Sequence, residues 1–167
     1  MLVNNKHIST VDSLLITEYI LFRYGPMSHL KLQKLLFYVD ALHLAYFDKE
    51  IVTDEFEAWL HGPVSRKVYN TVKDLSILYD EIKYHNVGGE KTPDILLKES
   101  VTDEQLELID EILAEYSKLT AFQLESLSHN EGPWLSARKG HAPSDKCTTP
   151  IDKDYTRNYY KEKVYGR

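Results

Sequence analysis

One stretch, Ser28 to Phe47, constrains the fold of this chain more than any other. Its apolar residues recur at three- and four-residue steps, which place side chains on one face of an α-helix. The opposite side is also largely apolar and leaves a narrow strip for solvent, formed by Lys31, Gln33, Lys34 and Asp40. Since a helix that is apolar nearly all round is buried by several neighbours, the sequence predicts a central helix over residues 28–47. At 1.5 Å per residue this helix is about 30 Å long.

The chain has 167 residues, a length that one hydrophobic core can serve. Its composition, 43% hydrophobic and 28% charged, is that of a soluble globular protein. The longest uninterrupted apolar run, Leu35 to Val39, is far too short to cross a bilayer, and the N-terminus has no signal-peptide core. We therefore expect a single domain over residues 1–167, located in the cytoplasm, with no membrane partner.

Helical patterns account for most of the remaining chain. A first helix begins at Ser9 or Asp12, either of which could cap it, and ends at Gly25-Pro26. Thr102 and Gln105 have capping-box spacing at the start of another helix. Further helices are predicted over residues 65–75, 121–128, 135–139 and 151–164. The predicted fold class is a mainly α, compact helical bundle around the central helix.

Strand signals are few and short. Residues 51–60 alternate apolar and polar side chains, which predicts a strand at about 54–60, followed by a turn at residues 61–64. Residues 86–94 are rich in turn-forming residues, and the segments on either side, 81–85 and 95–98, could pair as a β-hairpin. A short strand or hairpin is therefore expected beside the helices.

The charge balance disfavours nucleic acid as a partner. The formal net charge is -6, whereas phosphate binding needs a concentrated basic face. Seven acids occur without a base between Glu99 and Glu115, and we favour a solvated helix face over a docking surface for a basic partner. The first two helices have a helix-turn-helix appearance, but the second is too apolar for a major groove. A DNA-associated regulator of a phage or mobile element stays as an alternative function.

The candidates for catalysis are His61, His129, Glu131 and Cys147, and none forms a specific signature. Cys147, the single cysteine, lies in a polar connector and is predicted to be a free surface cysteine. Neither His61 nor His129 has a second metal ligand at helical spacing, and no glycine-rich phosphate loop is present. We therefore expect no catalytic site, metal or cofactor; a small hydrolase or transferase around His129 and Glu131 is the less favoured alternative.

Trp59 and Trp134 each lie beside a Gly-Pro pair. Such indoles either pack into the core or serve as exposed anchors for a partner, and core packing is the favoured interpretation. Glu57, on the predicted strand, could pair with Lys34 or Lys31. Gln33 and these two lysines either cover a buried pair with the strand at residues 57–59 or begin a partner-binding site.

Three pieces of the chain, taken in order, resemble one known family. They are the segment Lys31 to Tyr38, then residues 56–59 with 62–64 and 68–69, and finally residues 127–129 with 133–134. Together they are similar to the Panacea domain, also called the SocA-like antitoxin domain, found in phage-associated GepA-like proteins. The order and spacing of the three pieces make the resemblance fairly specific.

The resemblance implies a compact, mostly helical antitoxin that neutralises a cognate toxin protein by direct contact. In one branch of the family the domain presents the toxin to a bacterial protease, so a protease is a second implied partner. No catalytic residues are implied. The family-motif residues, which are also the possible partner-binding residues, are Lys31, Gln33, Lys34, Trp59, Gly62, Pro63, His129, Pro133 and Trp134.

Overall fold

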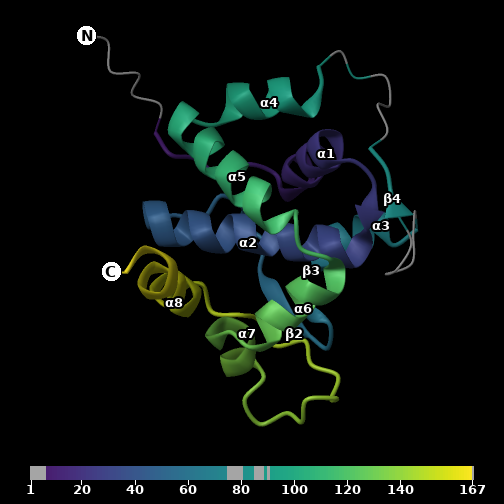
Figure 1. The fold of residues 1–167 in the computed structure, drawn as a ribbon, viewed down its shortest axis with the longest axis vertical. Coiled ribbons are helices and arrows are strands. Elements are labelled where there is room, and N and C mark those ends of the chain that lie inside the picture. Colours follow the sequence, from purple (N-terminus) through teal and green to yellow (C-terminus); the bar gives the residue numbers. More distant parts are fainter. Residues whose placement is uncertain (1–6, 75–80, 85–88, 90, 167) are drawn as a thin grey trace.

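Helix α2 (His29–Phe47) runs through the middle of the molecule, with the other elements arranged around it (Figure 1). A computed structural model describes residues 7–74, 81–84, 89 and 91–166 of the chain. Ser28 caps α2 by accepting a hydrogen bond from the Lys31 N–H at 3.1 Å. Sixteen of the nineteen helix residues are buried. The prediction of a central buried helix is therefore confirmed.

Three of the four residues of the polar strip do not face solvent, so the prediction is wrong for Gln33, Lys34 and Asp40, whereas Lys31 is half-buried. Gln33 and Lys34 are fully buried, and Asp40 is 2% exposed. The Asp40 carboxylate accepts two successive backbone N–H groups of the following loop, at 3.0 and 3.1 Å, and lies 3.1 Å from the Lys153 ammonium. An unsatisfied buried polar group costs about 1–3 kcal/mol, and these contacts avoid that cost. The strip joins α2 to its neighbours.

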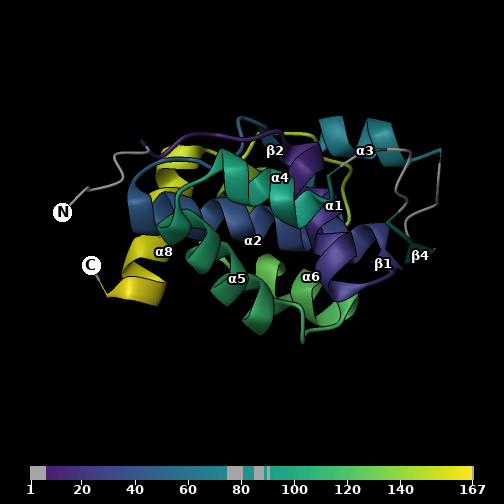
Figure 2. The same ribbon diagram turned by 90° about the horizontal axis from the view of Figure 1, so that it is seen from above.

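Helices α1 (Ser13–Tyr24) and α5 (Asp103–Tyr116) cover one side of α2, and α4 (Pro93–Ser100) packs on α1; Figure 2 shows the same arrangement from above. Asp12 rather than Ser9 caps α1, because its carboxylate accepts the Leu14 N–H at 2.9 Å. The predicted capping box at the start of α5 is present, with both reciprocal hydrogen bonds made. Local capping chemistry therefore sets where these helices begin.

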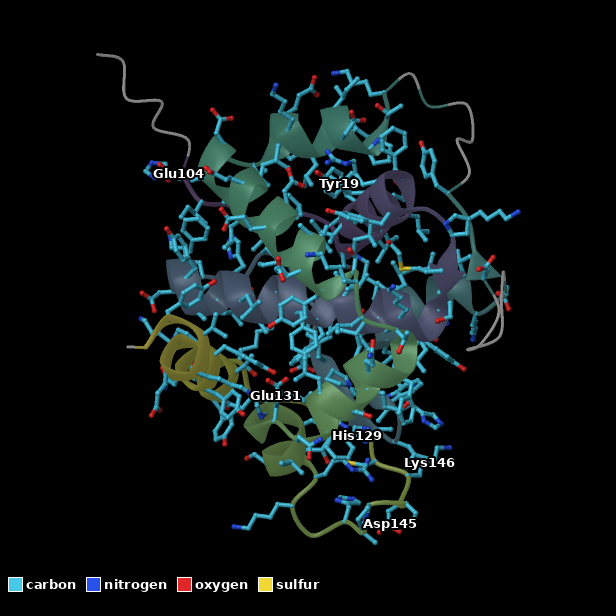
Figure 3. The ribbon with its side chains drawn as sticks, viewed as in Figure 1. Tyr19, Glu104, His129, Glu131, Asp145 and Lys146 are labelled. Atoms are coloured by element: carbon cyan, nitrogen blue, oxygen red, sulfur yellow. The ribbon has the colours of Figure 1, made fainter. Side chains whose placement is uncertain are left out.

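The acidic stretch of the sequence lies largely along α5. Glu104, labelled in Figure 3, is exposed like most of the other carboxylates of this helix. Asp110 is half-buried and accepts a hydrogen bond from the Tyr19 hydroxyl of α1. The stretch is thus a mostly solvated helix face with one carboxylate used in packing.

The other side of α2 carries α6 (Ala121–His129), α7 (Gly132–Ala137) and α8 (Lys153–Tyr165). Helix α7 begins three residues earlier than predicted. Pro133 lies in its first turn, where a missing backbone N–H costs nothing. Helices α6 and α8 agree closely with their predicted ranges. Among the described residues, no helix is both long and apolar enough to cross a membrane.

An antiparallel hairpin of β2 (Phe56–Trp59) and β3 (Gly62–Ser65) lies against α2 on this same side. Trp59 pairs with Gly62, so the connecting turn consists of Leu60–His61. The predicted strand is confirmed over β2. The predicted turn at residues 61–64 is wrong beyond its first residue, because the chain reverses sooner and residues 62–64 form the returning strand.

The second predicted hairpin, over residues 81–98, is wrong. Strand β4 (Glu81–Ile82) pairs with β1 (Met27–Ser28), while residues 95–98 belong to helix α4. The end of the helix predicted to Leu75 lies outside the described residues, as do residues 86–88 and 90 of the turn predicted at residues 86–94. Helix α3 (Arg66–Val72) begins after Ser65, as predicted. The fold is mainly helical with two small antiparallel strand pairs among the described residues.

Candidate functional site

Lys34 reaches from α2 to the β2–β3 hairpin. Its ammonium nitrogen Nζ donates a hydrogen bond to the backbone carbonyl of Pro63 at 3.0 Å, and the side chain is fully buried. Burial lowers the pKa of Lys34 to about 7, because desolvation disfavours the charged form; the nearby Glu125 carboxylate opposes this shift. A side chain that looked solvent-facing in the sequence thus anchors the hairpin.

Gly62 allows this close approach. Its φ of +105° is a conformation that residues with a side chain rarely adopt. A Cβ atom at this position would lie 2.4 Å from the Lys34 side-chain carbon Cε and 2.9 Å from the Ser128 hydroxyl oxygen. The turn therefore needs glycine for its backbone geometry and for the space that the lysine occupies.

Gln33 fixes the end of the hairpin nearest α3. Its side-chain carbonyl accepts the Ser65 backbone N–H at 2.9 Å, and its amide nitrogen donates to the Ser65 carbonyl at 3.2 Å. The same amide nitrogen lies 3.0 Å from the Nε2 atom of His29. Lys31 makes a separate contact, donating to the Ser117 carbonyl after α5 at 2.7 Å. It ties α2 to the opposite layer and does not join the hairpin.

His129 and Trp134 hold the hairpin from the other side. The Trp134 indole N–H donates to the Trp59 carbonyl at 2.8 Å, and the His129 ring stacks on the indole with centroids 4.0 Å apart. Burial lowers the pKa of His129, so its imidazole is neutral at pH 7. The Arg138 guanidinium lies 4.8 Å from the indole centroid and donates to the Ala58 carbonyl at 2.8 Å.

Most of the motif residues therefore form one unit, which we call the hairpin frame. It clamps β2 and β3 between α2 and the α6–α7 segment, and it comprises Gln33, Lys34, Gly62, Pro63, His129, Pro133 and Trp134. Of the two tryptophans, Trp134 is buried at 5% exposure, as favoured by the sequence. Trp59 is half-buried, and its side chain lines a pocket on the outer side of the hairpin.

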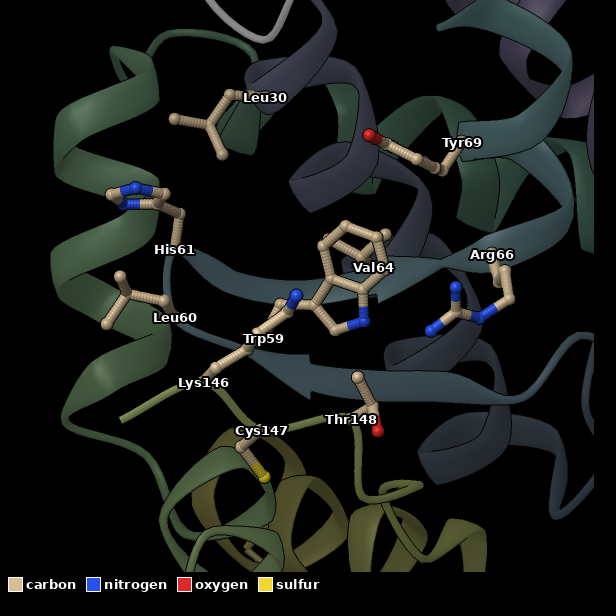
Figure 4. Close-up of a pocket in the computed structure, with 10 residues that line it drawn as sticks. All are labelled: Leu30, Trp59, Leu60, His61, Val64, Arg66, Tyr69, Lys146, Cys147 and Thr148. Carbon is tan, nitrogen blue, oxygen red and sulfur yellow. The ribbon is translucent and has the colours of Figure 1, made fainter. Parts of the chain in front are cut away.

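We call this depression, of about 470 Å³, the Trp59 pocket (Figure 4). Helix α2, the hairpin, helix α3 and the loop before α8 all contribute to its walls. The predicted pairing of Glu57 with Lys34 or Lys31 does not occur. Glu57 instead accepts two hydrogen bonds from Arg66 at the pocket edge, at 2.7 and 2.8 Å.

Glu131 belongs to a different cluster, although it is only two residues from His129. Its carboxylate accepts hydrogen bonds from the hydroxyls of Tyr38 and Tyr160, the latter at 3.0 Å, and from the Lys163 ammonium at 2.8 Å. It thereby joins α8 to α2. His129 and Glu131, both labelled in Figure 3, share none of these partners. The structure does not assemble them into the acid–base pair that a hydrolase or transferase would need.

Cys147 is 4% exposed, so the prediction of a surface cysteine is wrong. The loop that looked like a polar connector folds back along β2, where the Ala58 N–H donates to the Thr149 carbonyl at 2.9 Å. This backbone pairing turns the Cys147 side chain into the protein. Within the part of the chain that the structure describes, no three His, Cys, Asp or Glu side chains are grouped to hold a metal ion.

The sequence reasoning did not identify Arg66, Tyr69 and Lys146 of the Trp59 pocket as possible site residues. Tyr69 falls within the family-like segment and is an aromatic residue on the predicted helix that Ser65 caps, so it could have been considered. Arg66 and Lys146 carry no local signal, because only the folded chain brings the start of α3 and the loop before α8 together.

The fold and the hairpin frame define a mainly helical protein built around one buried helix. The chain belongs to the antitoxin SocA-like, Panacea domain family, whose model matches residues 32–135. It is 31% identical over 113 residues to Antitoxin SocA of Caulobacter vibrioides (strain NA1000 / CB15N). That match covers 65% of this chain and 58% of the relative, so the chain spans less than two thirds of the relative's length. No solved structure matches the chain.

Proposed function

We propose that the protein is a cytoplasmic antitoxin that neutralises a cognate toxin protein by direct binding. Membership of the SocA-like, Panacea domain family carries this proposal, and the relative from Caulobacter vibrioides is itself named an antitoxin. The proposal assigns the protein no catalytic role.

The arrangement of the motif residues supports a binding role. The matched range, residues 32–135, contains the whole hairpin frame, and the frame fixes a short hairpin beside an apolar pocket. A rigid surface loses little conformational freedom when a partner binds, which favours affinity. The buried motif residues thus act on the partner indirectly, by holding the surface that meets it.

Co-expression tests the proposal. The gene next to the one for this protein is induced alone and together with it, and growth is followed. The neighbouring product should arrest growth alone, and the wild-type protein should restore growth by forming a complex that co-purifies. A harmless neighbouring product, or toxicity that this protein does not relieve, would contradict the antitoxin role.

Blocking of the toxin and delivery to a protease give different toxin levels. If the protein blocks the toxin, an immunoblot should show unchanged toxin when the two are co-expressed. If the protein is a proteolysis adaptor, the toxin should disappear in normal cells and persist in cells that lack the protease. Direct blocking is the proposed mode, and delivery to a protease is the alternative that this measurement would reveal.

The alternative of a DNA-associated regulator loses its main support. It requires the second helix of the first two, α2, to enter a major groove with polar residues facing the bases. In the structure, sixteen of the nineteen residues of α2 are buried, including Gln33 and Lys34. We therefore do not propose DNA recognition by this helix.

A further inference from the structure

The Trp59 pocket lies on the outer side of the hairpin that the frame holds in place. We propose that it is the toxin-docking site, and that it receives a segment of the toxin with a large apolar side chain next to a carboxylate. This inference rests on the proposed antitoxin function and specifies which surface and which chemistry would perform it.

The pocket has an apolar floor. Leu30 and Val64 form buried parts of its lining, while Trp59 and Tyr69 are half-buried walls (Figure 4). Its volume of about 470 Å³ falls within the ~300–1,000 Å³ range that is typical of ligand pockets. A large apolar side chain from a partner would remove this lining from water, which is the main source of binding energy at interfaces.

The walls carry the residue types that dominate protein interfaces. Trp, Tyr and Arg are enriched among residues whose truncation costs most of the binding energy. Here the Trp59 and Tyr69 rings meet edge to face at 4.9 Å, and the Arg66 guanidinium lies 5.3 Å from the indole centroid. Glu57 holds Arg66 by two hydrogen bonds and accepts the indole N–H of Trp59 at 3.2 Å. These contacts hold the side chains of Trp59, Tyr69 and Arg66 in place in the free protein.

The charge of the pocket selects an anionic partner group. Its lining contains Arg66, Lys146 and the imidazole of His61 but no acidic residue, in a chain with 26 Asp and Glu against 20 Lys and Arg. Arg66 is paired with Glu57, and His61 lies 2.9 Å from a Glu125 carboxylate oxygen. Lys146 is exposed and makes no ion pair with any described residue. A carboxylate on the partner would therefore be attracted to the Lys146 edge.

Lys146 lies outside the range of the chain that the family model matches, unlike the aromatic walls of the pocket. Trp59, Arg66 and Tyr69 lie inside the family-matched range 32–135, whereas Lys146 lies in the loop after it. The apolar walls are therefore built on the part of the chain that resembles the family, and the cationic edge is built on a part outside that match.

Binding of the purified neighbouring gene product to full-length variants tests the inference. Trp59→Ala should weaken binding about 30-fold or more, the loss typical of an interface hot spot. Lys146→Glu should weaken it about fivefold, and the wild-type affinity should fall as salt is raised, because the charge contact is screened. Matched controls are Tyr46→Ala, an exposed aromatic residue at the far end of α2, and Lys98→Glu, an exposed lysine on α4; both should bind within about twofold of wild type.

Each variant is first checked for folding by circular dichroism and thermal unfolding. If Trp59→Ala fails to fold, Lys146→Glu still decides, because an exposed and unpaired lysine can be replaced without loss of the core. The inference is overturned if wild type binds and folded Trp59→Ala and Lys146→Glu bind equally well. It is also overturned if the pocket variants abolish dimerisation of this chain instead of toxin binding. Failure of wild type to bind or rescue overturns the antitoxin function itself and the inference with it.

Discussion

Two buried charged side chains, Lys34 and Glu131, are compensated very differently. Within the described residues Lys34 has one hydrogen-bond partner, the Pro63 carbonyl, and its pKa is lowered to about 7. Glu131 is surrounded by two tyrosine hydroxyls and the Lys163 ammonium. Both side chains join α2 to a neighbouring element, the hairpin in one case and α8 in the other.

The difference shows two ways of holding a helix to its neighbours. Glu131 holds α2 and α8 together through hydrogen bonds to its carboxylate, which is the acceptor for the buried hydroxyls of Tyr38 and Tyr160. Lys34 holds α2 and the hairpin together mainly by packing, because its long side chain fills the space left by the missing Cβ of Gly62. Its charge is poorly solvated there. Removal of the charge should therefore be costly at Glu131 and nearly free at Lys34.

Glu131→Ala should have the largest effect, about 3–5 kcal/mol of unfolding free energy. The hydroxyls of Tyr38 and Tyr160 lose their buried acceptor, and each unsatisfied group costs about 1–3 kcal/mol in addition to the lost packing. Lys163 is half exposed and adds little. Urea denaturation measures the change, with the exposed Glu162→Ala on α8 as control, expected within about 0.5 kcal/mol of wild type. Equal stability of the two variants would show that Glu131 is not the buried acceptor of the two tyrosine hydroxyls.

Leu36→Ala on α2 is the apolar reference for the two charged side chains, Lys34 on α2 and Glu131, which contacts α2 through Tyr38. Leu36 is fully buried, so its truncation should cost about 2–5 kcal/mol through lost transfer energy and the cavity left behind. The same urea titration measures it. A loss well under 1 kcal/mol would mean that α2 is not the centre of the core, and it would argue against deep burial of Lys34 and Glu131.

Gly62→Ala should cost about 1–3 kcal/mol from the positive φ alone, and more from contact with the Lys34 side chain. A double-mutant cycle with Lys34→Ala isolates the contact with Lys34, because in that background only the backbone cost and the contact with the Ser128 hydroxyl remain. Thermal or urea unfolding of the four proteins measures the cycle. Strict additivity would show that Lys34 does not fill the space beside Gly62.

Lys34→Met should have the smallest effect near pH 7, less than about 1.5 kcal/mol, because it keeps the shape of the side chain and removes a desolvated charge. Its signature is the pH dependence of stability. The pKa of Lys34 is about 7 in the folded protein and 10.5 in the unfolded reference, so between these values the unfolded chain binds more protons. Stability contributed by this residue therefore rises with pH across that window.

The measurement is urea denaturation of wild type and Lys34→Met at several pH values from about 7 to 9.5. Wild type should gain stability relative to the variant as the pH rises. Parallel pH profiles would show that Lys34 titrates normally and is not buried as a poorly compensated charge.

Local signals in the sequence predicted much of the fold. Asp12, one of the two capping residues considered for the first helix, and Thr102 cap their helices, and the apolar pattern of residues 28–47 identified the central helix correctly. The pairing of strands was not predictable in the same way. Residues 81–82 pair with residues 27–28, a contact between distant segments for which no local pattern exists.

For the candidate site, too, short motifs identified residues, whereas the contacts of those residues were not predictable. The family-like pieces named the residues of the hairpin frame, but they did not reveal that Lys34 is buried against Pro63 or that Trp59 opens toward a pocket. Lys34 was interpreted as solvent-facing because it is polar, whereas in the structure it is buried, with its ammonium bonded to the Pro63 carbonyl and its stem beside Gly62. Lys146 could not be found at all, since its role depends on the loop that folds back along β2.

The sequence by itself determined the central helix, the helical class and the family, because helix caps, apolar periodicity and short motifs depend on residues that are close together in the chain. The tertiary structure decided which polar residues are buried and which surface is available to a partner. Those properties depend on contacts between segments far apart in the chain, and the contacts at Lys34 and at Glu131 are the clearest examples.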